Sequence, residues 1–165
     1  MFKDIVLAVT PSAICDNAVD KAIAFAGFFD ARLYLTHVCD VAKGWDETDY
    51  LEASGTMAGV REKIAAYYRE KIRNVPQCEV VVRAGSPHNE ILRLARQKDA
   101  DLIVMGPRVE DASPARAKAN GSAGRTLERV SQRARCPVMI VPQEAQPVER
   151  FHSIVAATDF SAQDA

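Results

Sequence analysis

The sequence lacks long apolar runs and lacks an excess of charge of either sign. No apolar run approaches the roughly 20 residues that a membrane-spanning helix needs. The 21 Lys and Arg residues are balanced by 22 Asp and Glu residues, for a net charge of −1, so we expect no strong attraction to nucleic acid or to an anionic membrane. Residues 1–4 run directly into an apolar segment and show no signal-peptide pattern. These absences predict a cytoplasmic protein with neither nucleic-acid nor membrane partners.

Paired cysteines and metal-ligand spacings are also missing. No CxxC pair occurs among the four scattered cysteines, Cys15, Cys39, Cys78 and Cys136. This pattern argues against a disulfide framework or a zinc site and favours reduced thiols. The three histidines, His37, His88 and His152, show no ligand spacing, so we expect no metal.

Signatures of common enzyme classes are absent as well. The sequence contains no nucleophile elbow, metalloprotease motif or dinucleotide-binding fingerprint. His37 ends a predicted strand and is interpreted as structural, because no Ser or Cys partner for a catalytic base is recognisable beside it. His88 is predicted to be exposed in the first turn of a helix. We therefore predict a protein that is not an enzyme.

Short apolar segments alternate with amphipathic segments along the chain. At 165 residues and 48% hydrophobic content, the chain is long enough for one domain with a real core. Strands are predicted at residues 5–9, 31–38, 79–83, 101–106 and 137–141, with helices between them that include 58–72 and 124–134. The alternation predicts an α/β fold with a five-stranded, parallel, doubly wound sheet, because right-handed crossovers place helices on both faces.

The segment from Asp101 to Gly106 has the pattern of a strand buried on both faces, followed by a loop. In open α/β sheets, ligands bind in the crevice beyond the carboxyl ends of the central strands. The sequence therefore predicts a ligand site at Gly106 and the loop that follows it.

The beginning of the chain is repeated near its end. Residues 151–162 match residues 2–13 at a constant offset of 149, as in the pairs Phe2 and Phe151 or Ser12 and Ser161. Repetition at domain length predicts one domain at 1–142, a linker at 143–150 and the start of a truncated second copy at 151–165. The alternative is a chance match between two short apolar strands.

Three blocks of sequence resemble the universal stress protein family. They are Gly85-Ser86-Pro87, Asp101-Leu102-Ile103-Val104-Met105-Gly106 and Cys136-Pro137-Val138, and the resemblance extends over residues 2–142. It implies strand order 3-2-1-4-5, a regulatory or structural role in the stress response and, for one subclass, ATP binding. In that subclass the ligand lies at the ends of strands one, two and four and at a loop of the form Gly-x2-Gly-x9-Gly-Ser/Thr, whose backbone N–H groups approach the phosphates.

The chain departs from that loop pattern. Gly106 matches the first glycine, but Val109 stands where the second belongs. The last glycine falls on Gly124, followed by Arg125 instead of Ser or Thr, and its separation from Gly106 is 18 residues where the motif has 13. Thr10 replaces the acid common at the end of the first strand. We therefore predict a degenerate nucleotide site, weak or no ATP binding, and no cofactor.

The alternative is that the crevice still binds ATP with Mg or another phosphorylated ligand, with slow hydrolysis left open. Gly121-Ser122 offers a second register for the Gly-Ser pair, and loop arginines are candidate anion ligands unless they belong to a solvated charged loop. The candidate residues are Thr10, Pro11, Ser12 and Val38 for base and ribose, and Met105, Gly106, Arg108, Gly121, Ser122, Gly124, Arg125 and Thr126 near the phosphates.

The last predicted strand is short and apolar. If it lies at a sheet edge, it is expected to pair with another chain. The resemblance implies the same, since family members dimerise through this strand and tandem members exist. We expect a homodimer or a paired second domain through residues 138–141.

Overall fold

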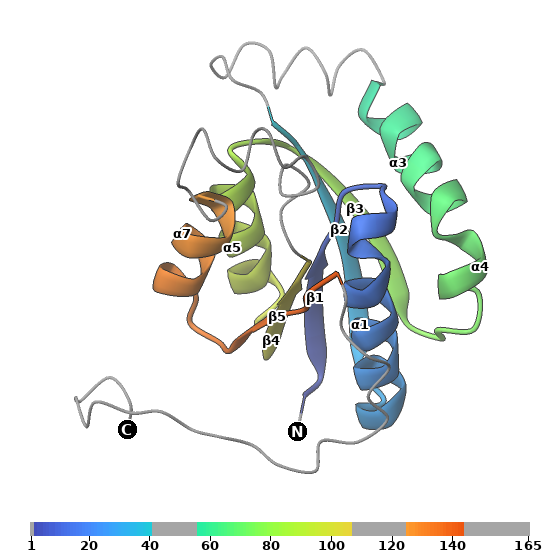
Figure 1. Ribbon diagram of the computed structural model, residues 1–165, viewed down its shortest axis with the longest axis horizontal. Coiled ribbons are helices and arrows are strands. Elements are labelled where there is room, and N and C mark those ends of the chain that lie inside the picture. The colour runs from blue at the N-terminus through green and yellow to red at the C-terminus, as the bar shows by residue number, and fades with distance from the viewer. Residues whose placement is uncertain (1, 41–55, 107–124, 144–165) are drawn as a thin grey trace.

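A single parallel sheet organises the computed structural model, which describes residues 2–40, 56–106 and 125–143 (Figure 1). The strand order is β3-β2-β1-β4-β5, which confirms the predicted fold class and order. The strands are β1 (Asp4–Ala8), β2 (Arg32–Asp40), β3 (Cys78–Gly85), β4 (Leu102–Met105) and β5 (Val138–Ile140).

Helices cover both faces of the sheet, as predicted (Figure 1). They are α1 (Asp16–Phe29), preceded by the short 3-10 helix η1 (Ala13–Cys15), then α3 (Thr56–Tyr67), α4 (Arg69–Ile72), α5 (Pro87–Gln97) and α7 (Arg125–Arg133). One face carries α1, α3 and α4, and the other carries α5 and α7. No helix within the described ranges is long and apolar enough to cross a membrane.

The central strand β1 alternates between two apolar cores. Ile5 and Leu7 pack with residues of α1 on one side, whereas Val6 packs with residues of α5 and α7 on the other. All three side chains are fully buried. Positions covered on both faces favour apolar residues, which explains why Ile5 to Ala8 of β1 and Leu102 to Met105 of β4 read as continuous apolar runs.

Three predicted boundaries were wrong. β2 and β3 pair in parallel as far as Asp40 and Gly85, so both extend past the expected ends at 38 and 83. The helix expected over 58–72 is interrupted at Tyr68, whose backbone leaves the helical region at φ −96° and ψ 7°. Tyr68 is fully buried, and its hydroxyl donates to the backbone carbonyl of Thr10, which follows β1. Tertiary contacts therefore decide its conformation.

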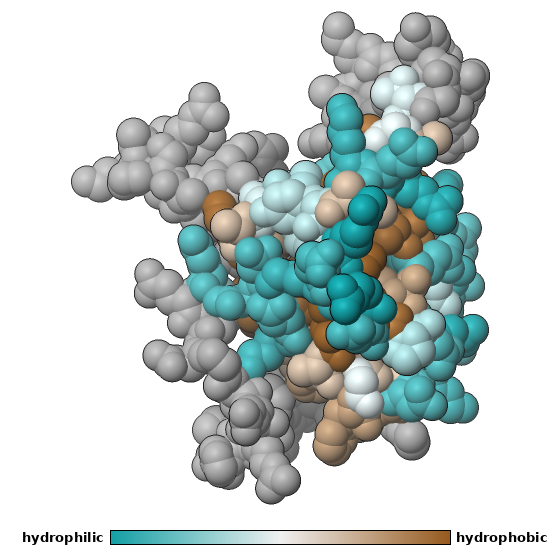
Figure 2. Space-filling model, turned by 90° about the vertical axis from the view of Figure 1, so that its right-hand side faces the viewer, coloured by the Kyte–Doolittle hydropathy of each residue, from teal (hydrophilic) through white to brown (hydrophobic). Residues whose placement is uncertain are grey.

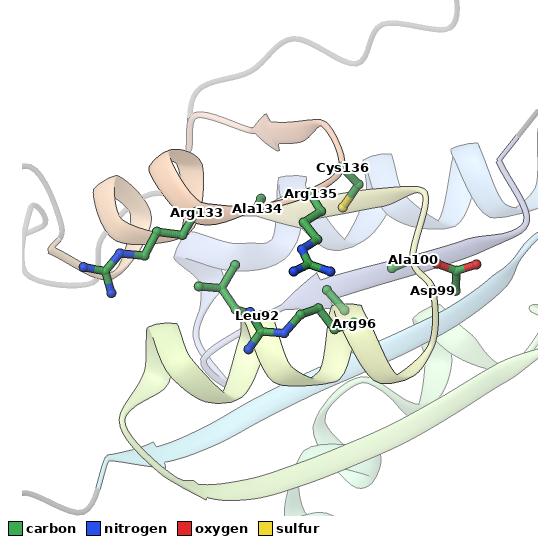
Figure 3. Close-up of a pocket in the computed structure, with 9 residues that line it drawn as sticks. Leu92, Arg96, Asp99, Ala100, Arg133, Ala134, Arg135 and Cys136 are labelled. Atoms are coloured by element: carbon green, nitrogen blue, oxygen red, sulfur yellow. The ribbon is translucent and has the colours of Figure 1, made fainter. Parts of the chain in front are cut away.

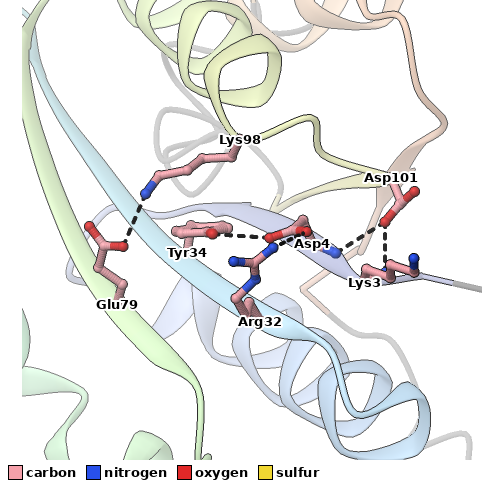
Figure 4. Close-up of polar contacts among 7 residues, drawn as sticks. All are labelled: Lys3, Asp4, Arg32, Tyr34, Glu79, Lys98 and Asp101. Atoms are coloured by element: carbon pink, nitrogen blue, oxygen red, sulfur yellow. Dashed lines mark hydrogen bonds and ion pairs between the residues drawn. The ribbon is translucent and has the colours of Figure 1, made fainter.

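The amino ends of β1 and β2 are joined by a buried carboxylate (Figure 4). Asp4 is only 5% exposed, and it accepts hydrogen bonds from the Tyr34 hydroxyl at 3.0 Å and from the Arg32 guanidinium at 2.8 Å. Burial, followed by the bond to Asp4, raises the pKa of Tyr34. The phenol therefore stays protonated and remains a donor to the carboxylate.

A second carboxylate joins β1 to β4. Asp101 accepts the backbone N–H groups of Lys3 at 2.7 Å and Asp4 at 3.1 Å, and these bonds lower the pKa of Asp101. On the far side of Tyr34, the Lys98 ammonium lies 4.5 Å from the ring centroid and pairs with Glu79 at 3.2 Å (Figure 4). The amino edge of the sheet is thus fixed by side chains as well as by the backbone ladder.

The face that carries α3 and α4 is mostly hydrophilic, with smaller apolar areas among the hydrophilic ones (Figure 2). Tyr67 on α3 is among the exposed large apolar side chains, at 50%.

The Asp4 network generates a stability prediction. Asp4→Ala removes a buried acceptor and leaves the Tyr34 hydroxyl unpaired, so we expect a loss of about 2–3 kcal/mol in the free energy of unfolding. Asp20→Ala is the matched control: it breaks an ion pair with Lys71, but the Asp20 side chain is 57% exposed, and the expected loss is below about 1 kcal/mol. Urea titration of both variants measures the difference, and equal losses would contradict this account.

Candidate functional site

The carboxyl ends of β1, β2 and β4 meet at one edge of the sheet. Ala8 is in register with Thr36 of β2 and with Met105 of β4. The pairing continues one residue further, where the Val9 N–H donates to the Thr36 carbonyl at 2.8 Å. The parallel register therefore brings Thr10, Val38 and Gly106 to the same edge, which we call the carboxyl edge.

The candidate residues divide into three groups. Thr10, Pro11, Ser12, Val38, Met105 and Gly106 lie at or beside the carboxyl edge. Arg125 and Thr126 occupy the first turn of α7, which packs against α5. Arg108, Gly121, Ser122 and Gly124 lie outside the described residues.

Gly106 is held in close contact with η1 and α1. A Cβ at this position would lie 3.2 Å from Sγ of Cys15 and 3.6 Å from Cβ of Ala18. The first distance is shorter than an ordinary van der Waals contact, so the close approach of two elements favours glycine here. Gly106 consequently has a structural reason to be glycine, independent of any ligand.

Two residues that the sequence does not point to, Cys15 and Tyr68, contact Thr10 at the carboxyl edge. Cys15 is buried, with its sulfur 3.5 Å from Oγ1 of Thr10. Tyr68 donates its hydroxyl to the Thr10 carbonyl at 2.8 Å, and burial strongly raises its pKa, so the hydroxyl keeps its proton. The helical spacing places Tyr68 toward the core, but nothing in the sequence indicates that it reaches Thr10.

Two buried polar atoms near the start of α1 have no hydrogen-bond partner within the described ranges. Ser12, expected to cap a helix, is extended at φ −157° and makes no side-chain capping bond. Its Oγ is buried without a hydrogen-bond partner, as is Oδ1 of Asp16 in the first turn of α1. The carboxyl edge therefore has an unpaired hydroxyl, that of Ser12, which can bond to a ligand. It also has the Asp16 carboxylate, which repels an anionic ligand.

The two described histidines make hydrogen bonds within the fold. Nδ1 of His37 lies 2.9 Å from the Val9 carbonyl, so it carries the proton and joins β2 to β1. The prediction that His88 is exposed was wrong: it is only 9% exposed, and its Nδ1 lies 2.9 Å from the Ser86 hydroxyl. Burial and then the charges of Arg129 and Arg133 lower the pKa of His88.

Within the described ranges, no group of three or more His, Cys, Asp or Glu residues is placed to hold a metal.

Comparison with known proteins identifies the family. The profile of the Universal stress protein family matches residues 1–142. The chain belongs to this family. Among curated relatives, a universal stress protein of Methanocaldococcus jannaschii is 30% identical over 149 residues, which cover 86% of this chain and 82% of the relative.

Solved structures of universal stress proteins share the fold. UspA from Lactobacillus plantarum aligns with a TM-score of 0.65 at 23% identity, over 85% of this chain and 97% of that protein. A universal stress protein solved in complex with cAMP aligns with a TM-score of 0.60 at 19% identity, over 86% of this chain and 98% of that chain. At these identities the likeness establishes the architecture alone.

The contact between Gly106 and Cys15 generates a second prediction. Gly106→Ala inserts a methyl group against Sγ, and we expect a loss of about 1–3 kcal/mol in stability from overpacking. The loss should shrink in a Cys15→Ala background, because the closest atom is then gone and the next, Cα of residue 15, is at 3.5 Å. A double-mutant cycle by chemical denaturation measures this coupling.

Gly59→Ala on α3 is the control, since a Cβ there meets nothing within 4 Å. Because alanine favours helix, that variant should gain about 0.5–1 kcal/mol. Additive effects of Gly106→Ala and Cys15→Ala would contradict the packing role of Gly106.

Proposed function

We propose that this chain is a regulatory or structural universal stress protein domain whose nucleotide site is degenerate, with weak or no binding of ATP. The observation that carries the proposal is the altered loop after β4. Val109 replaces the middle glycine, and the separation between Gly106 and Gly124 is 18 residues, where the ATP-binding pattern has 13. A phosphate-binding loop needs backbone N–H groups in close approach, and a branched side chain opposes that approach.

Charge at the carboxyl edge supports the same proposal. Asp16 brings a carboxylate to the first turn of α1, directly after Cys15, which packs against Gly106. Thr10 is a separate departure from the ATP-binding pattern, at the base and ribose: it supplies a neutral hydroxyl where the family commonly has an acid, and this hydroxyl lies beside Sγ of Cys15. Each lost hydrogen bond to a charged phosphate removes about 1.5–3 kcal/mol, which is more than tenfold in affinity.

The altered loop after β4 does not change the residues that are candidates to contact the base and ribose. Val38 offers an apolar surface, and Ser12 offers an unpartnered hydroxyl. A structural neighbour was solved with cAMP, a monophosphate. We therefore expect that any nucleotide affinity comes from base and ribose contacts, and that added phosphates contribute little. The role we propose is binding and regulation in the cytoplasm, not catalysis.

Calorimetric titration of the full chain with adenosine, AMP, ADP and ATP in the presence of Mg tests this proposal. The four affinities should be weak and agree within about threefold, because the phosphate contacts are missing. ATP binding in the micromolar range, at least tenfold tighter than AMP, would contradict the proposal and favour the alternative, an ATP-binding stress protein.

A variant with the family's loop pattern sharpens the test. It carries Val109→Gly and Arg125→Ser and lacks residues 112–116, so that the spacing of its three glycines and the following serine matches Gly-x2-Gly-x9-Gly-Ser. This variant should bind ATP more tightly than AMP, which the original chain should not. Its matched control keeps the same deletion and Arg125→Ser but carries Val109→Ala, which shortens the side chain without restoring glycine.

Edge strand β5 supports a proposal about association. Among the strands of the described residues, β5 pairs with β4 alone, and its Ile140 side chain is 47% exposed. An apolar edge strand tends to pair with another chain. We infer that β5 joins a second copy of this chain or a second domain of the tandem kind suggested by residues 151–162.

Light scattering of Ile140→Lys tests this association. The substitution places a charge on the edge of β5, so the dimer expected for the original chain should dissociate to monomers. Phe28→Lys on α1 is the control, because it removes an apolar side chain that is even more exposed, at 82%, from a helix. A dimer that survives Ile140→Lys, or that is lost equally in Phe28→Lys, would exclude pairing through β5.

A further inference from the structure

A small pocket lies at the amino edge of the sheet, opposite the carboxyl edge. It is bordered by the C-terminal half of α5, by the link from α5 to β4 and by the link from α7 to β5 (Figure 3). Asp99 lies in the link that precedes β4, and Cys136 lies in the link that precedes β5. Strands of a parallel sheet run in one direction, so this pocket and the candidate nucleotide site are at opposite ends.

Arginines dominate the polar lining of the pocket. Arg96, Arg133 and Arg135 line it, against a single carboxylate, Asp99. In Figure 3 the Arg135 side chain extends from the link before β5 toward α5, and the Arg96 side chain runs along α5 toward Leu92. Arg133 extends outward along α7, and the Asp99 carboxylate points away from the other two guanidiniums.

These arginines have no ion-pair partner within the described part of the chain. Other arginines do: Arg32 pairs with Asp4 and Arg93 with Glu90. Arg96 and Arg135 are both exposed, and an anion bound between them would accept charge-assisted hydrogen bonds from each guanidinium. In a chain with a net charge of −1, a local excess of positive charge is a feature of this site and not of the whole molecule.

The positive potential extends along α7. Arg129 and Arg133 are one helical turn apart on α7, and both contribute, after burial, to lowering the pKa of His88 on α5. His88 therefore lies near the positive charges of α7, at the other end of the α5–α7 interface.

The size of the pocket limits the ligand. Its volume is about 130 Å³. Pockets that enclose a whole nucleoside or a drug-sized molecule are larger, roughly 300–1,000 Å³. A single tetrahedral oxyanion fits, and the planar fork of arginine binds phosphate oxygens in pairs.

We propose that this pocket binds the phosphate group of a small phosphorylated ligand, with Arg96 and Arg135 as the two principal contacts. Leu92 forms the apolar wall behind them. The site is distinct from the nucleotide crevice of the family, and its occupancy does not depend on the loop after β4.

Titration of the ¹⁵N-labelled full chain with inorganic phosphate, followed by NMR at constant ionic strength, tests the proposal. The backbone signals of residues 96 and 133–136 should shift and saturate. Arg96→Gln and Arg135→Gln should each weaken binding at least tenfold, because each removes a charge-assisted pair of bonds. Arg96→Lys keeps the charge but loses the fork, and it should also weaken binding.

Arg61→Gln on α3 is the matched control, since it removes the same charge from an exposed position on the other face of the sheet. It should leave the affinity within twofold. A parallel titration with methyl phosphate separates the two sources of the group: tighter binding than inorganic phosphate indicates an ester, and equal or weaker binding indicates the free ion.

Non-saturating shifts would overturn the proposal, as would an equal loss in Arg61→Gln or an equal response to chloride. Spectra of each variant without phosphate show whether it is folded. We expect every variant to be folded, because the substituted arginine side chains are exposed.

Discussion

The pairing of β1 with a strand on each side is the constraint on which the rest of this structure depends. β1 pairs with β2 and with β4, and its apolar side chains are buried in both helix layers. No water is available there, so every backbone group of β1 must find its partner in the neighbouring strands. Asp101 strengthens this arrangement at the amino edge, where its carboxylate and its N–H group both bind the start of β1. Once that register is fixed, the carboxyl ends of β1, β2 and β4 coincide, and the carboxyl edge forms without any residue being selected for binding.

Much of this architecture could be predicted from the sequence, because burial on both faces leaves a strong signal. The run from Leu102 to Met105 is apolar at every position, and the resemblance to the stress protein family supplied the strand order. Predictions failed where tertiary contacts outweigh local pattern. His88 lies in the first turn of a helix, a position that is often exposed, but α7 packs over α5 and buries it. The break at Tyr68 has the same origin, since no local feature of the sequence indicates its bond to Thr10.

The candidate site was only partly accessible to sequence reasoning, for a related reason. Thr10, Val38 and Gly106 could be placed at one edge from strand order and register alone. A pattern of glycines indicates phosphate binding, yet Gly106 also fits tightly against Cys15. A glycine retained for packing carries little information about a ligand. The stronger evidence comes from Val109, because a missing glycine cannot be explained by the packing of Gly106.

The hydroxyl of Tyr68 connects the junction of α3 and α4 to the segment that follows β1. It arises between α3 and α4, and it ends on the carbonyl of Thr10 at the carboxyl edge. A molecule that moves Thr10 must either stretch this bond or draw the outer helices along with it. Because the Tyr68 ring is fully buried at the junction of α3 and α4, the same contact fixes both the Thr10 carbonyl and the packing of these helices on the sheet.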